Sequence, residues 1–339
     1  MFHKISLEDI NKDNLINFAC TDLGAFTTIG KNNLQNSGVT GVVIMEDRIP
    51  DFFILYDKYQ ADADTTLNRH GPFKDLYTQK HLKELVKELQ NQNIKVFLGF
   101  WGQLYDPHKN NNHNFQWMKD HPELWTLHRN DRRNSDIDAL AFLQKENISF
   151  AQFIVNQFIK FKNDFNFNGL FLGDGLNGYR LFVNPHRYED KEESKEDWTN
   201  FYKTISTGIH QLNCQLLAYD CLGLKPGKAI LHGADYLAQA KAGLDYIIVQ
   251  TYPTAWGKKW LKNHHGFDFK SCQNNLEKTY NKLKNTNCKV LYTLEMGDRI
   301  EEWKAKARIT KKQLKYFQKI SHGKLLVWAN ELFYRLLTK

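Results

Sequence analysis

The sequence contains a series of short apolar runs, each followed directly by a polar or aromatic residue. Runs of this length are typical of strands that are buried on both faces, as in a parallel sheet covered by helices. The clearest runs are residues 169–173, 216–219, 246–250, 290–294 and 325–328. Because helix-covered parallel sheets keep their chemistry at the carboxyl ends of the strands, the residues that follow these runs are candidates for a functional site.

Segments with apolar residues at helical spacing precede most of these runs. Residues 79–93 repeat Leu82, Leu85 and Leu89 on one helical face, and the apolar run 94–100 follows at once. The same order of helix and then strand recurs through the second half of the chain. Its expected pairs are 148–164 with 169–173, 197–212 with 214–219, 233–242 with 245–250, 271–285 with 288–294, and 311–320 with 324–329, before a short helix at 331–337.

Two further strands are expected near the amino terminus. One is 52–56, and the other is drawn from either 15–20 or 41–45, which brings the expected number of strands to eight. This alternation predicts an α/β fold, a (β/α)8 TIM barrel that forms a single catalytic domain over residues 1–339, with 1–40 as an uncertain N-terminal segment. A doubly wound open sheet is the alternative, but no glycine-rich phosphate-binding motif opens an expected helix.

A long polar stretch, residues 103–140, is expected to form an extended loop after the third strand. A loop of this length in a compact domain is usually functional. It contains His113, His121 and His128, but no HExxH or HxH spacing occurs anywhere in the chain. We therefore expect no bound metal and no cofactor.

Charge and cysteine usage restrict the class of partner. The formal net charge is +8 and the pI is about 9.0, yet lysine and arginine are spread along the expected helices and mixed with glutamate. This pattern indicates a basic, solvated surface rather than a nucleic-acid site, with an anionic ligand as the alternative. Five cysteines without a CxxC motif indicate neither a disulfide framework nor a zinc knuckle. No signal core or apolar stretch of membrane length occurs, so we expect a cytoplasmic protein without membrane contact.

Asp174 is the leading candidate for catalysis because it follows the apolar run 169–173 and lies between Gly173 and Gly175. The glycines permit a sharp exit from the strand, which would present the carboxylate in the barrel mouth. The alternative is an aspartate that caps the next helix or holds a turn.

Residues 167–180, FNGLFLGDGLNGYR, resemble the fourth strand of barrel glycoside hydrolases of the dextranase and cyclodextran-forming glucanotransferase type. In that family a phrase of the form F-x-G-x-x-x-G-D ends in the catalytic nucleophile, which implies that role for Asp174. Residues 81–102 also resemble the way many sugar-cleaving barrels enter their third strand, so the resemblance covers roughly residues 75–180.

The sixth expected strand departs from that family. The family's acid/base glutamate is expected there, but residues 245–257, DYIIVQTYPTAWG, carry no carboxylate after the strand. This phrase looks more like the sixth strand of chitinase-type barrels, in which a tyrosine helps to hold the substrate. The chitinase signature DxxDxDxE is absent from the fourth strand.

Glu295 is the expected partner of Asp174, since it ends the run 290–294, and strands four and seven are expected to face each other across the mouth. A salt bridge to Arg299 is the alternative role for Glu295. Asp220, after the fifth strand, could serve as the acid instead or could bind sugar hydroxyls. Carboxyl groups about 5–5.5 Å apart indicate retaining hydrolysis, and about 6.5–9.5 Å indicates inversion.

Aromatic and polar residues at the strand ends suit a sugar site, because flat rings stack on the C–H faces of pyranoses while oxygen and nitrogen atoms bind the hydroxyls. Core packing of each ring is the alternative. The substrate-binding candidates are Trp101, Tyr252, Trp256, Trp328, Asp57, Asn330 and Glu331.

These features together predict a glycoside hydrolase or transglycosidase with a retaining mechanism that cleaves an oligo- or polysaccharide. Asp174 would attack the anomeric carbon, and Glu295 would protonate the leaving oxygen and later activate water. A non-catalytic carbohydrate-binding barrel is one alternative. A barrel lyase or isomerase acting on an anionic sugar is another, which the charge of +8 would favour.

Overall fold

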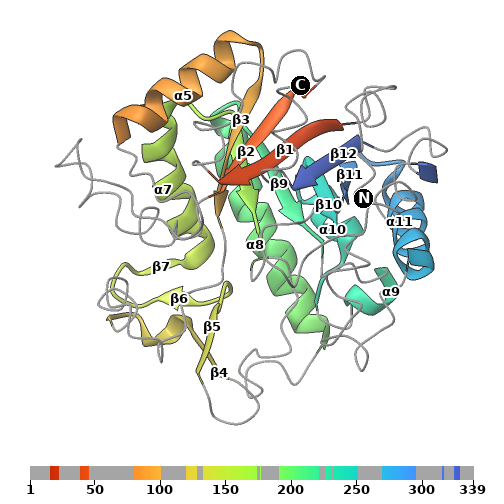
Figure 1. The fold of residues 1–339 in the computed structure, drawn as a ribbon. Coiled ribbons are helices and arrows are strands. Elements are labelled where there is room, and N and C mark those ends of the chain that lie inside the picture. Colours follow the sequence, from red (N-terminus) through yellow and green to blue (C-terminus); the bar gives the residue numbers. More distant parts are fainter. Residues whose placement is uncertain are drawn as a thin grey trace.

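Eight parallel strands close into a barrel in the order β1, β2, β3, β8, β9, β10, β11, β12 (Figure 1). The computed structural model describes residues 16–22, 39–45, 79–100, 120–127, 133–173, 176, 191–220, 226–230, 233–250, 269–294, 315–316 and 324–328. The barrel strands are β1 (Ile16–Asp22), β2 (Gly41–Met45), β3 (Lys95–Phe100), β8 (Gly169–Leu172), β9 (Gln215–Tyr219), β10 (Tyr246–Val249), β11 (Lys289–Leu294) and β12 (Lys324–Trp328). The expected α/β fold on a parallel sheet is confirmed, and the closed sheet contradicts the doubly wound alternative.

The amino-terminal strands differ from the sequence-based expectation. Both candidate runs form strands: β1 pairs with β2 from Phe18 opposite Gly41 onwards, and β2 pairs directly with β3. Taking only one of them was therefore wrong, and the uncertain segment 1–40 contains a strand of the barrel. The expected strand at 52–56 lies outside the described residues. Local sequence could not show that both runs form strands, because strand pairing is made between residues that are distant in the chain.

Helices occupy the described connections between successive strands, as the helical spacing predicted. They are α5 (Gln79–Asn91), α7 (Phe150–Phe165), α8 (Lys191–Gln211), the single-turn α9 (Pro226–Ala229), α10 (Tyr236–Lys241) and α11 (Phe269–Leu283). The boundaries of α7 have clear causes. Ser149 accepts the N–H of Gln152 as the N-cap, and Asn166 adopts a left-handed conformation, φ 60°, that ends the helix. Of the expected helix at 311–320 the structure describes 315–316, and the segment 331–337 lies outside it.

Alternate residues of the barrel strands whose side chains are described belong to two separate cores. Val43, Phe97, Phe171 and Leu217 form part of a cluster in the barrel interior. Their strand neighbours, such as Leu98, pack in the larger cluster between the sheet and the helices. This alternation follows from the two-residue period of a strand, and it fixes which residues at the strand ends share the interior register.

The region after β3 has structure of its own. It contains the 3₁₀ turn η3 (Pro122–Leu124) and two antiparallel ladders, which pair β4 (Trp125–Leu127) with β5 (Arg133–Ile137) and β6 (Phe142–Leu143) with β7 (Ile148–Ser149). The expectation of a plain extended loop over 103–140 is corrected for this described part, while residues 101–119 and 128–132 lie outside it. In Figure 1 the ladders lie beside the beginning of α7.

A buried histidine holds this insertion together. His121 is 2% exposed, and its two ring nitrogens lie 3.1 Å from a carboxylate oxygen of Glu123 and 3.2 Å from one of Glu146. Glu123 also accepts the N–H of Gln144. A histidine bracketed by two carboxylates is a structural cross-link, so His121 serves packing here.

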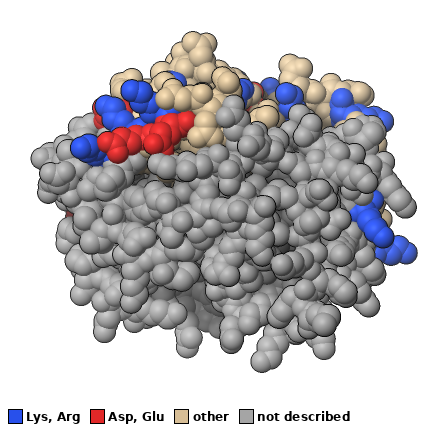
Figure 2. Space-filling view, turned by 45° about the horizontal axis from the view of Figure 1, so that its top comes forward, with Lys and Arg blue, Asp and Glu red and all other residues tan. Residues whose placement is uncertain are grey.

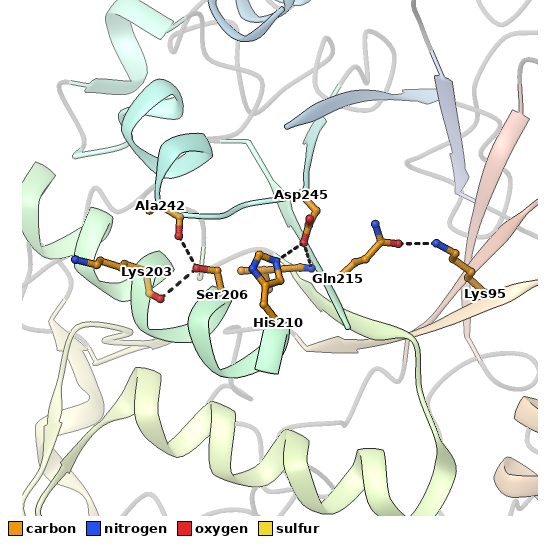
Figure 3. A network of polar contacts seen from close by, with 8 residues as sticks. Lys95, Lys203, Ser206, His210, Gln215, Ala242 and Asp245 are labelled. Carbon is orange, nitrogen blue, oxygen red and sulfur yellow. Dashed lines mark hydrogen bonds and ion pairs between the residues drawn. The ribbon is translucent and has the colours of Figure 1, made fainter. Parts of the chain in front are cut away.

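A polar network ties the amino-terminal ends of β9 and β10 to the helix layer (Figure 3). His210 on α8 lies 2.8 Å from a carboxylate oxygen of Asp245, and the same oxygen accepts the N–H of Leu216. Ser206, one turn earlier on α8, donates to the carbonyl of Ala242. In a parallel barrel the amino-terminal face supports stability, so we assign this network a structural role.

The described surface mixes both signs of charge. Helix α5 exposes Lys83, Glu84, Lys87 and Glu88 next to one another. The acidic side chains visible in Figure 2 likewise lie beside basic ones. Mixed charges of this kind agree with a solvated surface on this face. Within the described residues, no helix is both long and apolar enough to cross a membrane.

The interior of the barrel leaves no room for a side chain at Gly169. A Cβ atom there would lie 2.1 Å from the carbonyl oxygen of Gln215 and 2.7 Å from the ring of Phe97. Because the Gln215 oxygen is backbone, relief requires the strands to move. We expect Gly169→Ala to lower the free energy of unfolding by about 3 kcal/mol, measured by urea denaturation. The matched control is Gly227→Ala, where a Cβ meets nothing within 4 Å, and an equal loss in both variants would contradict the prediction.

The contribution of Glu123 to the stability of the insertion should be lost in acid. Burial alone raises the pKa of the Glu123 carboxyl, but hydrogen bonds from its own backbone N–H, from His121 and from the Gln144 N–H outweigh this effect and hold the pKa below its usual value. A lowered folded-state pKa stabilises the protein above the unfolded-state value, and this contribution disappears as the pH falls through the folded-state value. We expect the Tm of Glu123→Gln to fall less than that of wild type between about pH 5 and pH 3. The exposed Glu84→Gln variant should follow wild type.

Candidate active site at the carboxyl ends of the strands

The carboxyl ends of all eight barrel strands meet at one rim, since every pair in the barrel is parallel. The described residues that follow these ends include Gly173 after β8, Asp220 after β9 and Gln250 after β10. All three are buried. This rim is where parallel barrels assemble their chemistry.

Asp220 links two neighbouring strands at the rim. Its backbone N–H donates to the carbonyl of Ile248 at 2.8 Å, and its Oδ1 accepts the N–H of Gln250 at 3.1 Å. The residue is 0% exposed. A buried carboxylate that accepts a backbone N–H holds the chain beyond β10 in place, so Asp220 acts at least as a cross-strand tie.

The interior register at the rim contains residues that the sequence analysis did not select. Gln250 continues the register of Tyr246 and Ile248, which belong to the interior cluster, and Thr293 continues that of Leu291. Thr293 also donates to the carbonyl of Val249 at 3.2 Å. In the sequence, Gln250 and Thr293 each stand two positions after an apolar residue that faces the interior. This pattern identifies them only when the inward face of the strand is known.

Beneath these residues the interior is aromatic. The rings of Phe171 and Tyr219 meet edge to face, with centroids 4.9 Å apart and planes at 85°. Both side chains are almost fully buried. This pair closes the interior below the rim, so a ligand at the rim would lie on a rigid apolar base.

Most of the predicted site residues lie outside the described part of the chain. The two leading carboxylates nevertheless adjoin described strands: Asp174 comes two residues after Leu172, the end of β8, and Glu295 directly follows Leu294, the end of β11. Of the aromatic candidates, Trp328 ends β12, where its backbone pairs with Cys20. The predicted residues outside the described ranges are Asp174, Glu295, Trp101, Tyr252, Trp256, Asp57, Asn330 and Glu331.

The barrel order corrects one expectation about the carboxylates. Strands β8 and β11 are three positions apart around the barrel, with β9 and β10 between them, so they are not directly opposite. The strand four positions from β8 is β12. The carboxyl ends of β8 and β11 are therefore separated by those of β9 and β10, after which Asp220 and Gln250 lie.

Among the described residues, no group of three or more histidine, cysteine, aspartate or glutamate side chains could hold a metal ion. Cys214 and Cys288, two of the described cysteines, are buried. Burial raises the pKa of Cys288 to about 12 and raises the pKa of Cys214, so neither thiol is activated.

Comparison with known proteins finds similarity of fold. No family model matches the chain, and no curated protein matches its sequence significantly. The glycoside hydrolase domain of PelA from Pseudomonas aeruginosa superposes with a TM-score of 0.53 at 12% identity, over 94% of this chain and 96% of that one. A class V chitinase from Pseudomonas fluorescens Pf-5 superposes with a TM-score of 0.52 at 14% identity, over 95% and 98%. The chain thus has a barrel fold that glycoside hydrolases use.

Two substitutions test whether the hydrogen bond from the Gln250 N–H is what Asp220 contributes to stability. Asp220→Ala removes the acceptor for the Gln250 N–H, and we expect it to lower the free energy of unfolding by about 1–3 kcal/mol. Asp220→Asn keeps an acceptor oxygen and should lose much less. If denaturation shows equal losses for both variants, the hydrogen bond to Gln250 is not what Asp220 contributes.

Proposed function

We propose that the chain is a retaining glycoside hydrolase or transglycosidase, built as one (β/α)8 catalytic domain with a structured insertion after its third strand. The observation that carries the proposal is the ending of β8 and β11 just before Asp174 and Glu295, in a barrel whose fold is shared with glycoside hydrolases. Most glycoside hydrolases cleave the glycosidic bond with one pair of carboxylates that flank it.

Strand alternation suggests how each carboxylate would reach the substrate. Glu295 continues the interior register of Leu291 and Thr293, so extension of β11 by one residue would aim it into the barrel mouth. By the same extension of β8, Asp174 would share the outer register of Leu172. We therefore propose that its carboxylate reaches the mouth through a turn away from the strand direction, which the glycines on both sides of Asp174 allow.

The proposed reaction has two steps. Asp174 attacks the anomeric carbon and forms a glycosyl-enzyme, while Glu295 gives its proton to the departing oxygen. Glu295 then takes a proton from water, or from an acceptor sugar, which attacks the same carbon and releases Asp174. Asp220 would hold the rim between the two carboxylates through its hydrogen bond to the Gln250 backbone, and remains the alternative acid.

The proposed substrate contacts surround this pair. Gln250 and Thr293 supply polar groups in the interior register. Aromatic platforms and further hydroxyl ligands come from the strand ends. These proposed contacts are Trp101, Tyr252, Trp256, Trp328, Asp57, Asn330 and Glu331.

The two carboxylates can be distinguished by leaving group. On oligosaccharides, whose leaving sugars need a proton, we expect both Asp174→Asn and Glu295→Gln to lower kcat/KM by about 10²–10⁴-fold or more. On a dinitrophenyl glycoside, whose leaving group needs no proton, Glu295→Gln should still form the glycosyl-enzyme in a burst. Asp174→Asn should not.

Asp220→Asn tests the alternative acid in the same experiment: if Asp220 rather than Glu295 protonates the leaving sugar, Asp220→Asn should show the loss that is confined to oligosaccharides. Full activity of Asp174→Asn on every substrate that wild type cleaves would overturn its role as nucleophile. Sugar binding without cleavage by wild type would instead indicate the non-catalytic barrel.

A further inference from the structure

We propose that the hairpin of β6 and β7 carries an outer sugar-binding subsite, in which the ring of Phe142 is the platform for one pyranose of a long substrate. The proposal rests on the function proposed above and extends it to the substrate class, namely a chain long enough to reach from the cleavage point to the insertion. Among the residues whose burial the structure describes, Phe142 is the one large hydrophobic side chain that is exposed, at 43%.

The exposure of Phe142 is imposed by its neighbours. Ala141 is 1% exposed and Leu143 is 0% exposed, and both belong to the core that packs against the helices. Since adjacent residues of a strand point to opposite faces, burial of Leu143 holds the Phe142 ring towards solvent. The solvent face of a short strand normally carries polar residues, but single exposed apolar side chains are common on protein surfaces. The proposal therefore depends on where the hairpin holds this ring.

The hairpin is a rigid support for the ring. Phe142 pairs with Ser149 across the ladder, and Ser149 is itself fixed as the N-cap of α7. At the turn, the N–H of Gln144 donates to Glu123, and Glu146 contacts the buried His121 at 3.2 Å. A platform held in this way loses little conformational entropy when a ligand stacks on it.

The hairpin stands at the rim of the barrel. The carbonyl of Ala141, next to Phe142, accepts the N–H of Phe150 at 2.9 Å. The ring of Phe150 lies 6.3 Å from that of Phe100, the last residue of β3. Figure 1 shows the ladder of β6 and β7 beside the start of α7, which follows from this connection. Phe142 is therefore next to the rim but outside the ring of strand ends, as an outer subsite requires.

The chemistry of the surroundings favours a sugar over a protein partner. One exposed aromatic ring offers a contact area far smaller than the roughly 800 Å² that each partner buries in a stable protein interface. It matches the apolar C–H face of one pyranose, and the exposed side chain of Gln144 next to it in the chain can bind hydroxyls. The ammonium group of Lys145 instead lies 3.2 Å from a carboxylate oxygen of Asp120.

The test compares Phe142→Ala with Phe142→Tyr and wild type on isomalto-, malto- and chito-oligosaccharides from disaccharide to hexasaccharide. Loss of the ring should lower kcat/KM about fivefold on the longest substrate that is cleaved and leave the shortest unchanged, while tyrosine should retain the wild-type value. Lys145→Ala is the matched hairpin control, and an unchanged Tm shows that each variant is folded. If kcat/KM depends on substrate length in the same way in Phe142→Ala and in wild type, the subsite proposal is overturned.

Affinity electrophoresis in gels that contain dextran, soluble starch or glycol chitin tests the subsite without catalysis. Retardation of wild type that is lost in Phe142→Ala and kept in Phe142→Tyr supports the platform, even if no substrate is cleaved and the hydrolase proposal fails. Equal migration of wild type and Phe142→Ala in all three gels overturns it.

Discussion

Closure of the parallel sheet is the constraint on which the rest of the molecule depends. Pairing of β1 with both β2 and β12 removes the free edges of the barrel sheet and separates its apolar residues into an interior cluster and an outer one. Closure also forces narrow packing inside, which Gly169 demonstrates through its approach to the Gln215 carbonyl and the Phe97 ring. The same closure brings the carboxyl ends of distant strands to one rim.

The two ends of the barrel use carboxylates differently. At the amino-terminal end, Asp245 joins the N–H of Leu216 and the imidazole of His210, half-exposed on α8, so the network fastens a helix to the sheet. At the carboxyl end, Asp220 is completely buried and joins β9 to the chain after β10. A tie of this kind makes the rim rigid, which a site that must hold two reacting groups in place requires.

The phrase that resembles dextranase-type enzymes has two physical components. Its first glycine, Gly169, is explained by packing alone, because any side chain there would clash with the backbone of the neighbouring strand. The functional content of the resemblance therefore rests on the later part of the phrase, Gly173 and Asp174, where the strand has already ended.

The sequence by itself determined the alternation of helices and barrel strands from α5 to β11, because apolar runs and helical spacing are local signals. It did not show the two antiparallel ladders between β3 and α7. Tertiary structure alone decided that residues 16–22 and 41–45 both join the barrel, since strand pairing is non-local. It also decided that Gln250 lies in the interior register and that Asp220 accepts its N–H. Finally, it turned Phe142 outwards at the rim, because burial of Ala141 and Leu143 depends on the core that they meet.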